Sequence, residues 1–242
     1  MNIFKKYKIY TREYGTKYVW SKFLEYKVML PINNFFLKLG EKLFSNAELR
    51  NTIIIESHND FDCNGGAIYD YLIANHYNEK YKLIWLVKNK VTKKMPRNVQ
   101  CFNYYKPSIK KTWFIATAKF LFSDDFITKK MKNEQVSVYC THGGCAIKNV
   151  KGILVVPNDV DYILSSSNNF DPIMCDNYSI PYPNTRMLHF GFPSNDVFFN
   201  KSEDELKKVT KKEYAHVFLW MPTFRQLKDN INRIDGVSDN PF

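Results

Sequence analysis

From residue 51 onward, short runs of β-branched and aromatic residues alternate with stretches of helical character, and this alternation constrains the fold most strongly. Buried strands are expected at Thr52–Glu56 and Leu83–Val87, and helices at Gly66–His76 and Ser108–Ala118, where Ser108 is the expected N-cap. Further strands are expected at 99–103, 120–123, 136–139, 153–156, 162–165 and 187–190. This order predicts βα units around a parallel sheet, a Rossmann-like α/β domain.

The N-terminal segment differs from the rest of the chain in its charge. Residues 1–50 contain ten Lys or Arg and four Asp or Glu, a net +6 out of +11 for the whole sequence. Residues 1–48 are predicted to form one or two amphipathic helices, with Trp20, Phe23, Phe35 and Phe36 at helical spacing among the lysines. Basic residues beside bulky aromatic ones are typical of helices that bind an anionic membrane surface. The alternative is a helical hairpin packed on the body with its lysines in solvent.

Several classes of protein are not expected from this composition. No stretch approaches the roughly 20 apolar residues of a membrane span, and no secretory signal is expected. The five cysteines form no Cys-x-x-Cys pair, which favours free thiols in a reducing cytosol and no metal site. Nucleic acid is not an expected partner, because no nucleic-acid motif occurs and the basic excess lies at one end.

Two loops at the ends of expected strands contain polar residues suited to a site. Ser57–Asp62 follows the first strand, and Asn64 and Gly65 then open a helix whose free amides would suit an anion. The aspartates in this loop would instead suit a cation or a polyol hydroxyl, and a purely structural turn is the third alternative. After the strand at 136–139, His142 precedes Gly143 in a setting suited to a general base, and Lys148 follows to meet a phosphate. The alternative is a turn histidine satisfied by backbone groups.

Two more short segments lie toward the C-terminus. Gly191–Asp196 has the composition of a turn and contains Asn195. Pro222–Arg225 directly follows an expected strand at 216–220, so that Arg225 is placed to contact a phosphate, unless it is simply an exposed arginine.

The segments around His142, at Gly191–Asp196 and at Pro222–Arg225 resemble motifs of the CDP-glycerol glycerophosphotransferase family of teichoic acid and capsule polymer enzymes. The resemblance extends, in the same order and spacing, to Ser57–Leu72, Tyr81–Asn89 and Ala118–Asp124. The resemblance implies a GT-B fold of two Rossmann-like domains in a peripheral enzyme at the cytoplasmic face of the plasma membrane. It also implies a CDP-activated polyol donor, a lipid-linked polymer acceptor and no cofactor beyond the donor. The residues matched to its site are His142 as catalytic base and Asn64, Gly65, Gly143, Lys148, Asn195, Asp196 and Arg225 as substrate contacts.

The sequence departs from the family pattern near two motifs. Thr141 stands where the family usually has tryptophan, and Ser194 where it usually has arginine. The expected organisation is a membrane-association segment at 1–50, an acceptor domain at 51–200, and at 201–242 only the start of a nucleotide-binding domain. The chain is therefore expected to be truncated in that second domain. A GT-B glycosyltransferase using a nucleotide sugar, with the same histidine as base, and a non-catalytic membrane-associated remnant are the alternative functions.

Overall fold

The computed structural model describes residues 3–141, 151–152 and 155–199, together with four isolated positions beyond residue 200. The chain divides into two compact units, one made of Met1–Val28 with Asn200–Phe242 and the other of Met29–Phe199. The second unit contains the sheet, and it includes residues 29–49, which the sequence analysis assigned to the N-terminal segment. The strand expected at 216–220 lies outside the described residues, apart from two of those isolated positions.

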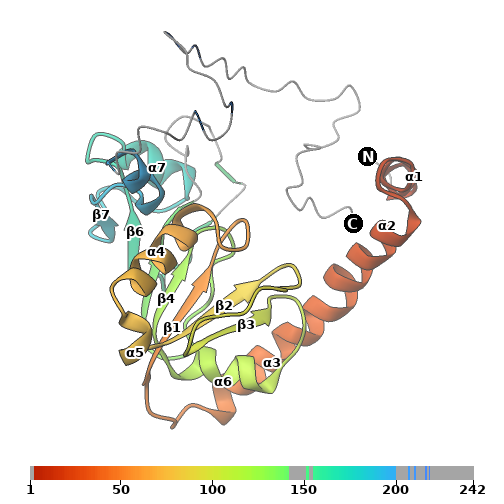
Figure 1. Cartoon of the computed structure of the whole chain (residues 1–242), viewed down its shortest axis with the longest axis horizontal. Coiled ribbons are helices and arrows are strands. Elements are labelled where there is room, and N and C mark those ends of the chain that lie inside the picture. Colours follow the sequence, from red (N-terminus) through yellow and green to blue (C-terminus); the bar gives the residue numbers. More distant parts are fainter. Residues whose placement is uncertain are drawn as a thin grey trace. The chain divides into compact units, whose positions relative to one another are not determined.

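The second unit is built on a seven-stranded sheet in which every neighbouring pair of strands is parallel (Figure 1). Its order is β3-β2-β1-β4-β5-β6-β7. The strands are β1 (Arg50–Glu56), β2 (Lys82–Val87), β3 (Val99–Asn103), β4 (Ala118–Ser123), β5 (Val136–Tyr139), β6 (Tyr162–Leu164) and β7 (Met187–Leu188). The predicted α/β class with a Rossmann-like parallel sheet is confirmed.

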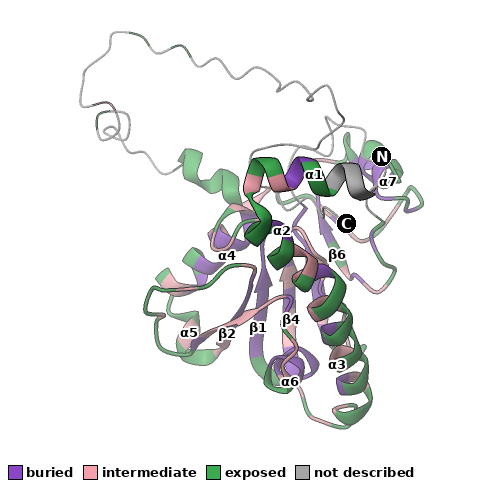
Figure 2. Ribbon diagram, turned by 90° about the vertical axis from the view of Figure 1, so that its right-hand side faces the viewer, coloured by how far each residue is buried: buried purple, intermediate pink, exposed green. Residues whose placement is uncertain are grey.

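Helices cover both faces of the sheet. Successive residues of each strand point to opposite sides, so each strand contributes side chains to two separate cores. Ile53 and Ile55 pack toward α4 (Cys63–Ala74), whereas Ile54 packs toward α6 (Ile109–Thr117). The helix α3 (Leu30–Leu43) lies against α6 and adds Leu37 to that second core. Figure 2 shows the mostly buried strand β1 and the partly buried strand β4 between α4 and α3. The remaining elements are α5 (Tyr77–Lys80), α7 (Asp171–Asn177) and the 3-10 helix η2 (Pro193–Phe199).

The start of α6 follows the sequence prediction. The hydroxyl oxygen of Ser108 accepts a hydrogen bond from the backbone N–H of Lys111, as an N-cap does. The Lys111 side chain is buried, and its ammonium group donates to the carbonyl oxygens of Asn103, Tyr104 and Lys106 at 2.7–2.9 Å. Burial lowers the pKa of Lys111 to about 7. This lysine therefore closes the turn between β3 and α6.

The close approach of α3 and α6 depends on Gly40. This glycine is buried, and a Cβ atom added there would overlap Cγ2 of Thr112, which is fully buried on α6. Because Thr112 also donates its hydroxyl to the carbonyl of Ser108, its side chain is fixed in place. The two helices can pack at this distance only with glycine at position 40.

Gly40→Ala should therefore lower the free energy of unfolding by about 2 kcal/mol, the usual cost of overpacking a core. Chemical denaturation of the purified chain measures this. In the G40A/T112S double variant, serine keeps the hydroxyl and removes the overlapping methyl group, so most of the loss should be recovered. An unchanged stability of G40A, or no recovery in the double variant, would show that this contact does not set the helix spacing.

The N-terminal unit is helical, as predicted for this segment. It contains α1 (Ile3–Tyr14), α2 (Thr16–Phe23) and most of the π-helical segment η1 (Leu24–Met29). A small cluster of Ile9, Tyr10 and Val19 is buried within it, while Trp20 is 59% exposed. Among the helices that the structure describes, none combines the length and the apolar character needed to cross a membrane.

Candidate functional site

The polar residues singled out in the sequence gather at the carboxyl edge of the sheet, where β1 and β4 lie side by side. Chain order reverses at this pair, because β2 and β3 extend to one side of β1 whereas β5, β6 and β7 continue beyond β4. Open α/β sheets bind their ligands in the crevice at such a switch point. Ser57 and His58 directly follow β1, and Asp124 and Asp125 directly follow β4, so both loops lie at this point.

Asp124 joins the two loops. It is fully buried, and its carboxylate accepts hydrogen bonds from the Ser57 hydroxyl at 3.1 Å, the His58 N–H at 2.6 Å and the Gly65 N–H at 3.2 Å. The backbone N–H of Cys63 donates to the side chain of Asp62 at 2.7 Å. The amides of Cys63 and Gly65 at the start of α4 are therefore occupied by the protein's own carboxylates and are not free for an anion.

Gly65 is required where α4 meets β1. A Cβ atom added there would lie 2.8 Å from Cβ of Ser57 and 3.0 Å from the carbonyl oxygen of Glu56. Only glycine allows the helix to start this close to the strand, and this closeness lets the Gly65 amide reach Asp124. The structure thus shows a packing reason for Gly65, and its contact with substrate stays a prediction.

Asn64 connects three segments that are far apart in the sequence. Its side-chain NH₂ donates to the carbonyl oxygens of Cys140 at 3.1 Å and Thr141 at 2.8 Å. Its side-chain oxygen accepts a hydrogen bond from the backbone N–H of Ser194 at 3.1 Å. Because Asn64 is only 3% exposed, these bonds form in the interior, where unpaired partners are costly. The residue predicted as a substrate contact therefore fixes the chain directly before His142.

Asn64→Asp should lower the free energy of unfolding by at least about 2 kcal/mol. The substitution keeps the size of the side chain but places a carboxylate against two carbonyl oxygens, so both donated bonds are lost in a buried site. Asn75→Asp is the matched control, because Asn75, the C-cap residue of α4, also donates its side-chain NH₂ to a carbonyl, that of Tyr71 at 2.9 Å, but at an exposed position. Equal losses in the two variants, measured by urea denaturation, would contradict the role given to Asn64.

Thr141 has an unusual backbone conformation. Its φ of 57° lies in the left-handed region, which β-branched residues rarely occupy. The side chain is fully buried, and its hydroxyl oxygen has no hydrogen-bond partner within the described residues. Strain of this kind is concentrated at functional sites, where neighbouring contacts hold it in place. Here the bond from Asn64 to the Thr141 carbonyl is such a contact.

A buried charge cluster lies beside this edge. The ammonium group of Lys88 is 2.6 Å from Asp125 and 3.3 Å from Glu56, and it donates to the carbonyls of Ser57 and His58. Burial raises the pKa of Glu56 to about 8, although Lys88 opposes the shift. Burial also acts to raise the pKa of Asp125, but the hydrogen bond from His58 and the charge of Lys88 hold it below its ordinary value. At neutral pH the principal ion pair is therefore Lys88 with Asp125.

A second histidine–carboxylate pair lies at the ends of β6 and β7. Nε2 of His189 is 2.7 Å from Oδ2 of the buried Asp171, whose other oxygen accepts a bond from the Ser165 hydroxyl at 2.7 Å. The strand expected at 187–190 is shorter in the structure, because β7 ends at Leu188, and the imidazole of His189 beyond it is 38% exposed. A carboxylate that fixes one ring nitrogen orients the imidazole, so His189 is a candidate site residue that the sequence analysis missed.

Asn195 and Asp196 lie in η2, which packs against α4. The backbone N–H of Asn195 donates to the carbonyl of Phe192 at 2.9 Å. Asp196 lines a cavity of about 300 Å³ together with Tyr71 of α4 and Cys140 at the end of β5. The structure therefore brings the 193–196 segment to the same edge as Asn64.

The other predicted site residues cannot be placed. His142, Gly143, Lys148 and Arg225 lie outside the described residues, so their roles stay predictions. Among the residues that are described, no group of three or more His, Cys, Asp or Glu is arranged to hold a metal ion.

A sequence profile described as CDP-glycerol:poly(glycerophosphate) glycerophosphotransferase matches residues 43–234, which is most of the chain. The chain belongs to this family. The matched range includes the residues of the switch-point edge, the segment around His142 and the Pro222–Arg225 segment. The resemblance read from the sequence is thereby confirmed, and so is the assignment to a glycerophosphotransferase family.

The individual relatives share only a quarter or less of their aligned residues with this chain. The teichoic acid poly(glycerol phosphate) polymerase of Bacillus spizizenii is 24% identical over 200 residues, which cover 72% of this chain and 50% of that protein. Two solved structures of the wall teichoic acid polymerase TagF match with TM-scores of 0.59 and 0.57, the first of a variant soaked with CDPG. They are 20% and 21% identical and cover 81% and 79% of this chain, but 55% and 51% of theirs. The likeness shows the fold, and the chain spans about half the length of these relatives.

Proposed function

We propose that this protein transfers glycerol phosphate, or a related polyol phosphate, from a CDP-activated donor to a hydroxyl of a lipid-linked acceptor in teichoic acid or capsule polymer synthesis. The acceptor oxygen forms a bond to the phosphorus that carries the glycerol. The bond from that phosphorus to the CMP oxygen breaks, and CMP leaves. The proton of the acceptor hydroxyl passes to a general base, for which His142 is proposed.

The observation that carries this proposal is the meeting of three family segments at one sheet edge. Asn64 donates to the carbonyl of Thr141, two residues after β5 and directly before His142, and it accepts from Ser194 in the 193–196 segment. A base on the residue after Thr141 would then stand at the switch-point crevice, where parallel sheets bind ligands. Lys148 and Arg225 are proposed to contact the phosphates, since positioning and charge stabilisation supply most of the catalysis in phosphoryl transfer.

Release of CMP tests the proposed reaction. The native protein that carries this chain is incubated with CDP-glycerol and a lipid-linked acceptor, and then with each of them alone. We expect CMP only when donor and acceptor are both present, with no cofactor beyond the donor. Release of nucleotide from UDP-sugars in place of CDP-glycerol would favour a glycosyltransferase. No release from any donor would favour a non-catalytic membrane-associated protein.

We also propose that the chain acts at the cytoplasmic face of the plasma membrane through its N-terminal helices. On α3, Ile32, Phe35, Leu39 and Leu43 form an exposed apolar stripe at helical spacing, and Phe35 and Leu43 are 63% and 60% exposed. Lys38 and Lys42 are exposed on the same helix. An apolar stripe flanked by lysines suits an anionic lipid surface, where each Lys or Arg contributes about 1 kcal/mol.

Sedimentation with liposomes tests this surface. The F35S/L43S variant should bind vesicles of anionic lipid at least about tenfold more weakly, because two large apolar side chains no longer enter the membrane. Tyr71→Ser is the control, since Tyr71 is also 60% exposed but lies on α4, across the sheet. Equal binding to neutral and anionic vesicles, or equal weakening by Tyr71→Ser, would rule out the proposed membrane surface.

A further inference from the structure

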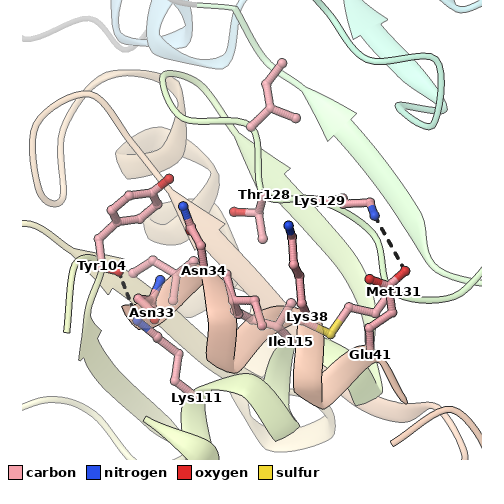
Figure 3. A pocket seen from close by; sticks show the side chains of 13 residues that line it. Asn33, Asn34, Lys38, Glu41, Tyr104, Lys111, Ile115, Thr128, Lys129 and Met131 are labelled. Atoms are coloured by element: carbon pink, nitrogen blue, oxygen red, sulfur yellow. Dashed lines mark hydrogen bonds and ion pairs between the residues drawn. The ribbon is translucent and has the colours of Figure 1, made fainter. Parts of the chain in front are cut away.

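A pocket of about 330 Å³ lies on the face of the sheet opposite α4. Its walls come from α3, from α6 and from the 127–131 loop, which follows Asp125 of the charge cluster (Figure 3). Its volume lies within the range of small-molecule sites in proteins. The pocket is separate from the carboxyl edge of the sheet, where transfer is proposed. The loop from Asp125 to Met131 connects that edge with the pocket.

Two buried polar groups in this pocket have no hydrogen-bond partner among the described residues. Asn33 is 3% exposed with its side-chain oxygen unpaired, and Thr128 is 9% exposed with its hydroxyl unpaired. Both residues line the cavity. Because an unpaired buried polar group is costly, such groups indicate a ligand or water that completes them. The oxygen of Asn33 needs a donor, and the hydroxyl of Thr128 either donates or accepts, so a ligand with hydroxyl groups satisfies both.

The charged residues of the pocket favour an anion. Lys38 and Lys129 both line it, and one carboxylate, that of Glu41, lies 3.5 Å from Lys129. In Figure 3 the side chains of Asn34 and Lys38 rise from α3 toward Thr128 across the pocket. Lys38 forms no hydrogen bond or ion pair with any residue that the structure describes, whereas the ammonium donors of Lys111 are directed to three backbone carbonyls.

The remaining walls are apolar, with Leu37, Leu86, Ile115, Ile127 and Met131. A ligand that fits this combination has hydroxyl groups, an anionic group and a short carbon skeleton. We propose that the pocket between α3, α6 and the 127–131 loop binds a polyol phosphate such as a glycerol phosphate group. The group would reach the pocket either as a soluble molecule or as part of a membrane lipid.

Binding of sn-glycerol 3-phosphate to the full chain tests the proposal, with inorganic phosphate and glycerol as comparison probes. Isothermal titration or ligand-observed NMR should show tighter binding of glycerol 3-phosphate than of either comparison probe. Thr128→Val should weaken it about fivefold, the loss of one hydrogen bond. This variant removes an unpaired hydroxyl, so it should fold normally. Lys38→Gln should weaken binding about as much, whereas Lys42→Gln, an equal change of charge outside the pocket, should leave it unchanged.

The result decides both the site and the source of the ligand. No binding of glycerol 3-phosphate, or binding that T128V and K38Q leave intact, would overturn the proposal. Equal affinity for inorganic phosphate and glycerol 3-phosphate would also overturn it, because the hydroxyl contacts would then contribute nothing. If specific binding is found, phosphatidylglycerol vesicles that displace the soluble probe support a lipid source. Failure of these vesicles to displace it supports a soluble or polymer-borne source of the same group. Neither result depends on transfer activity.

Discussion

His142→Ala should reduce the rate of glycerol phosphate transfer by about 10²–10⁴-fold, the usual contribution of a positioned general base. The residue follows Thr141, whose carbonyl is fixed by Asn64 and whose backbone is strained. A base at this position would meet the acceptor hydroxyl at the carboxyl edge of the sheet. The rate of CMP release by the native protein, with donor and acceptor at saturation, measures the effect.

Two other histidines at the same edge serve as comparisons. His58 lies with its Nδ1 3.5 Å from Asp125, and His189 bonds to Asp171 at 2.7 Å. Because the family resemblance assigns the base to His142 and to neither of these residues, we expect a smaller loss of rate from H58A and H189A than from H142A. Circular dichroism confirms that all three variants fold. Near-normal transfer by H142A together with loss in either of the others would move the base to that histidine.

Lys88→Met should lower the free energy of unfolding by about 3 kcal/mol, the typical cost of removing one partner of a buried ion pair. The methionine fills similar space but leaves Asp125 without its cation, and it leaves the carbonyls of Ser57 and His58 without a donor. The Lys88 side chain is only 10% exposed, so water does not readily replace it. Chemical denaturation at pH 7 measures the loss.

Two further variants separate lost charge pairing from lost packing. In K88M/D125N the unpaired negative charge is removed, so part of the stability should return. Lys90→Met replaces an exposed lysine of the same loop and should change stability by less than about 0.5 kcal/mol. If K88M is no more harmful than Lys90→Met, the cluster does not stabilise the edge.

The sheet and its helices were predictable because each depends on neighbouring residues. The TIII run of β1 and the Ser108 cap of α6 are local patterns, and both elements form where they were expected. The expected strand at 153–156 shows the limit of such patterns, because Val155 and Val156 belong to no strand in the structure. An apolar run by itself does not show whether a neighbouring strand pairs with it.

The contacts within the site were not predictable in the same way. Asn64 looked like part of a glycine-rich phosphate loop, but its partners are 76, 77 and 130 residues away in the sequence. The pairing of His189 with Asp171 depends on where β7 ends, and a run of two strand residues leaves that end undefined. The charge cluster could have been predicted from the sequence, since Lys88 and Asp125 each lie just past the end of an expected strand. Adjacent parallel strands bring such residues to one edge.

The central claim is that the phosphate and its glycerol move together from CDP-glycerol to a lipid-linked acceptor. A donor with ³²P in the phosphate next to the glycerol and ¹⁴C in the glycerol tests this directly in the native protein. The account predicts that both labels enter the lipid-extractable product in the ratio they had in the donor, and that the released CMP carries neither. Absence of label from the lipid fraction, or the transfer of ¹⁴C without ³²P, would contradict it.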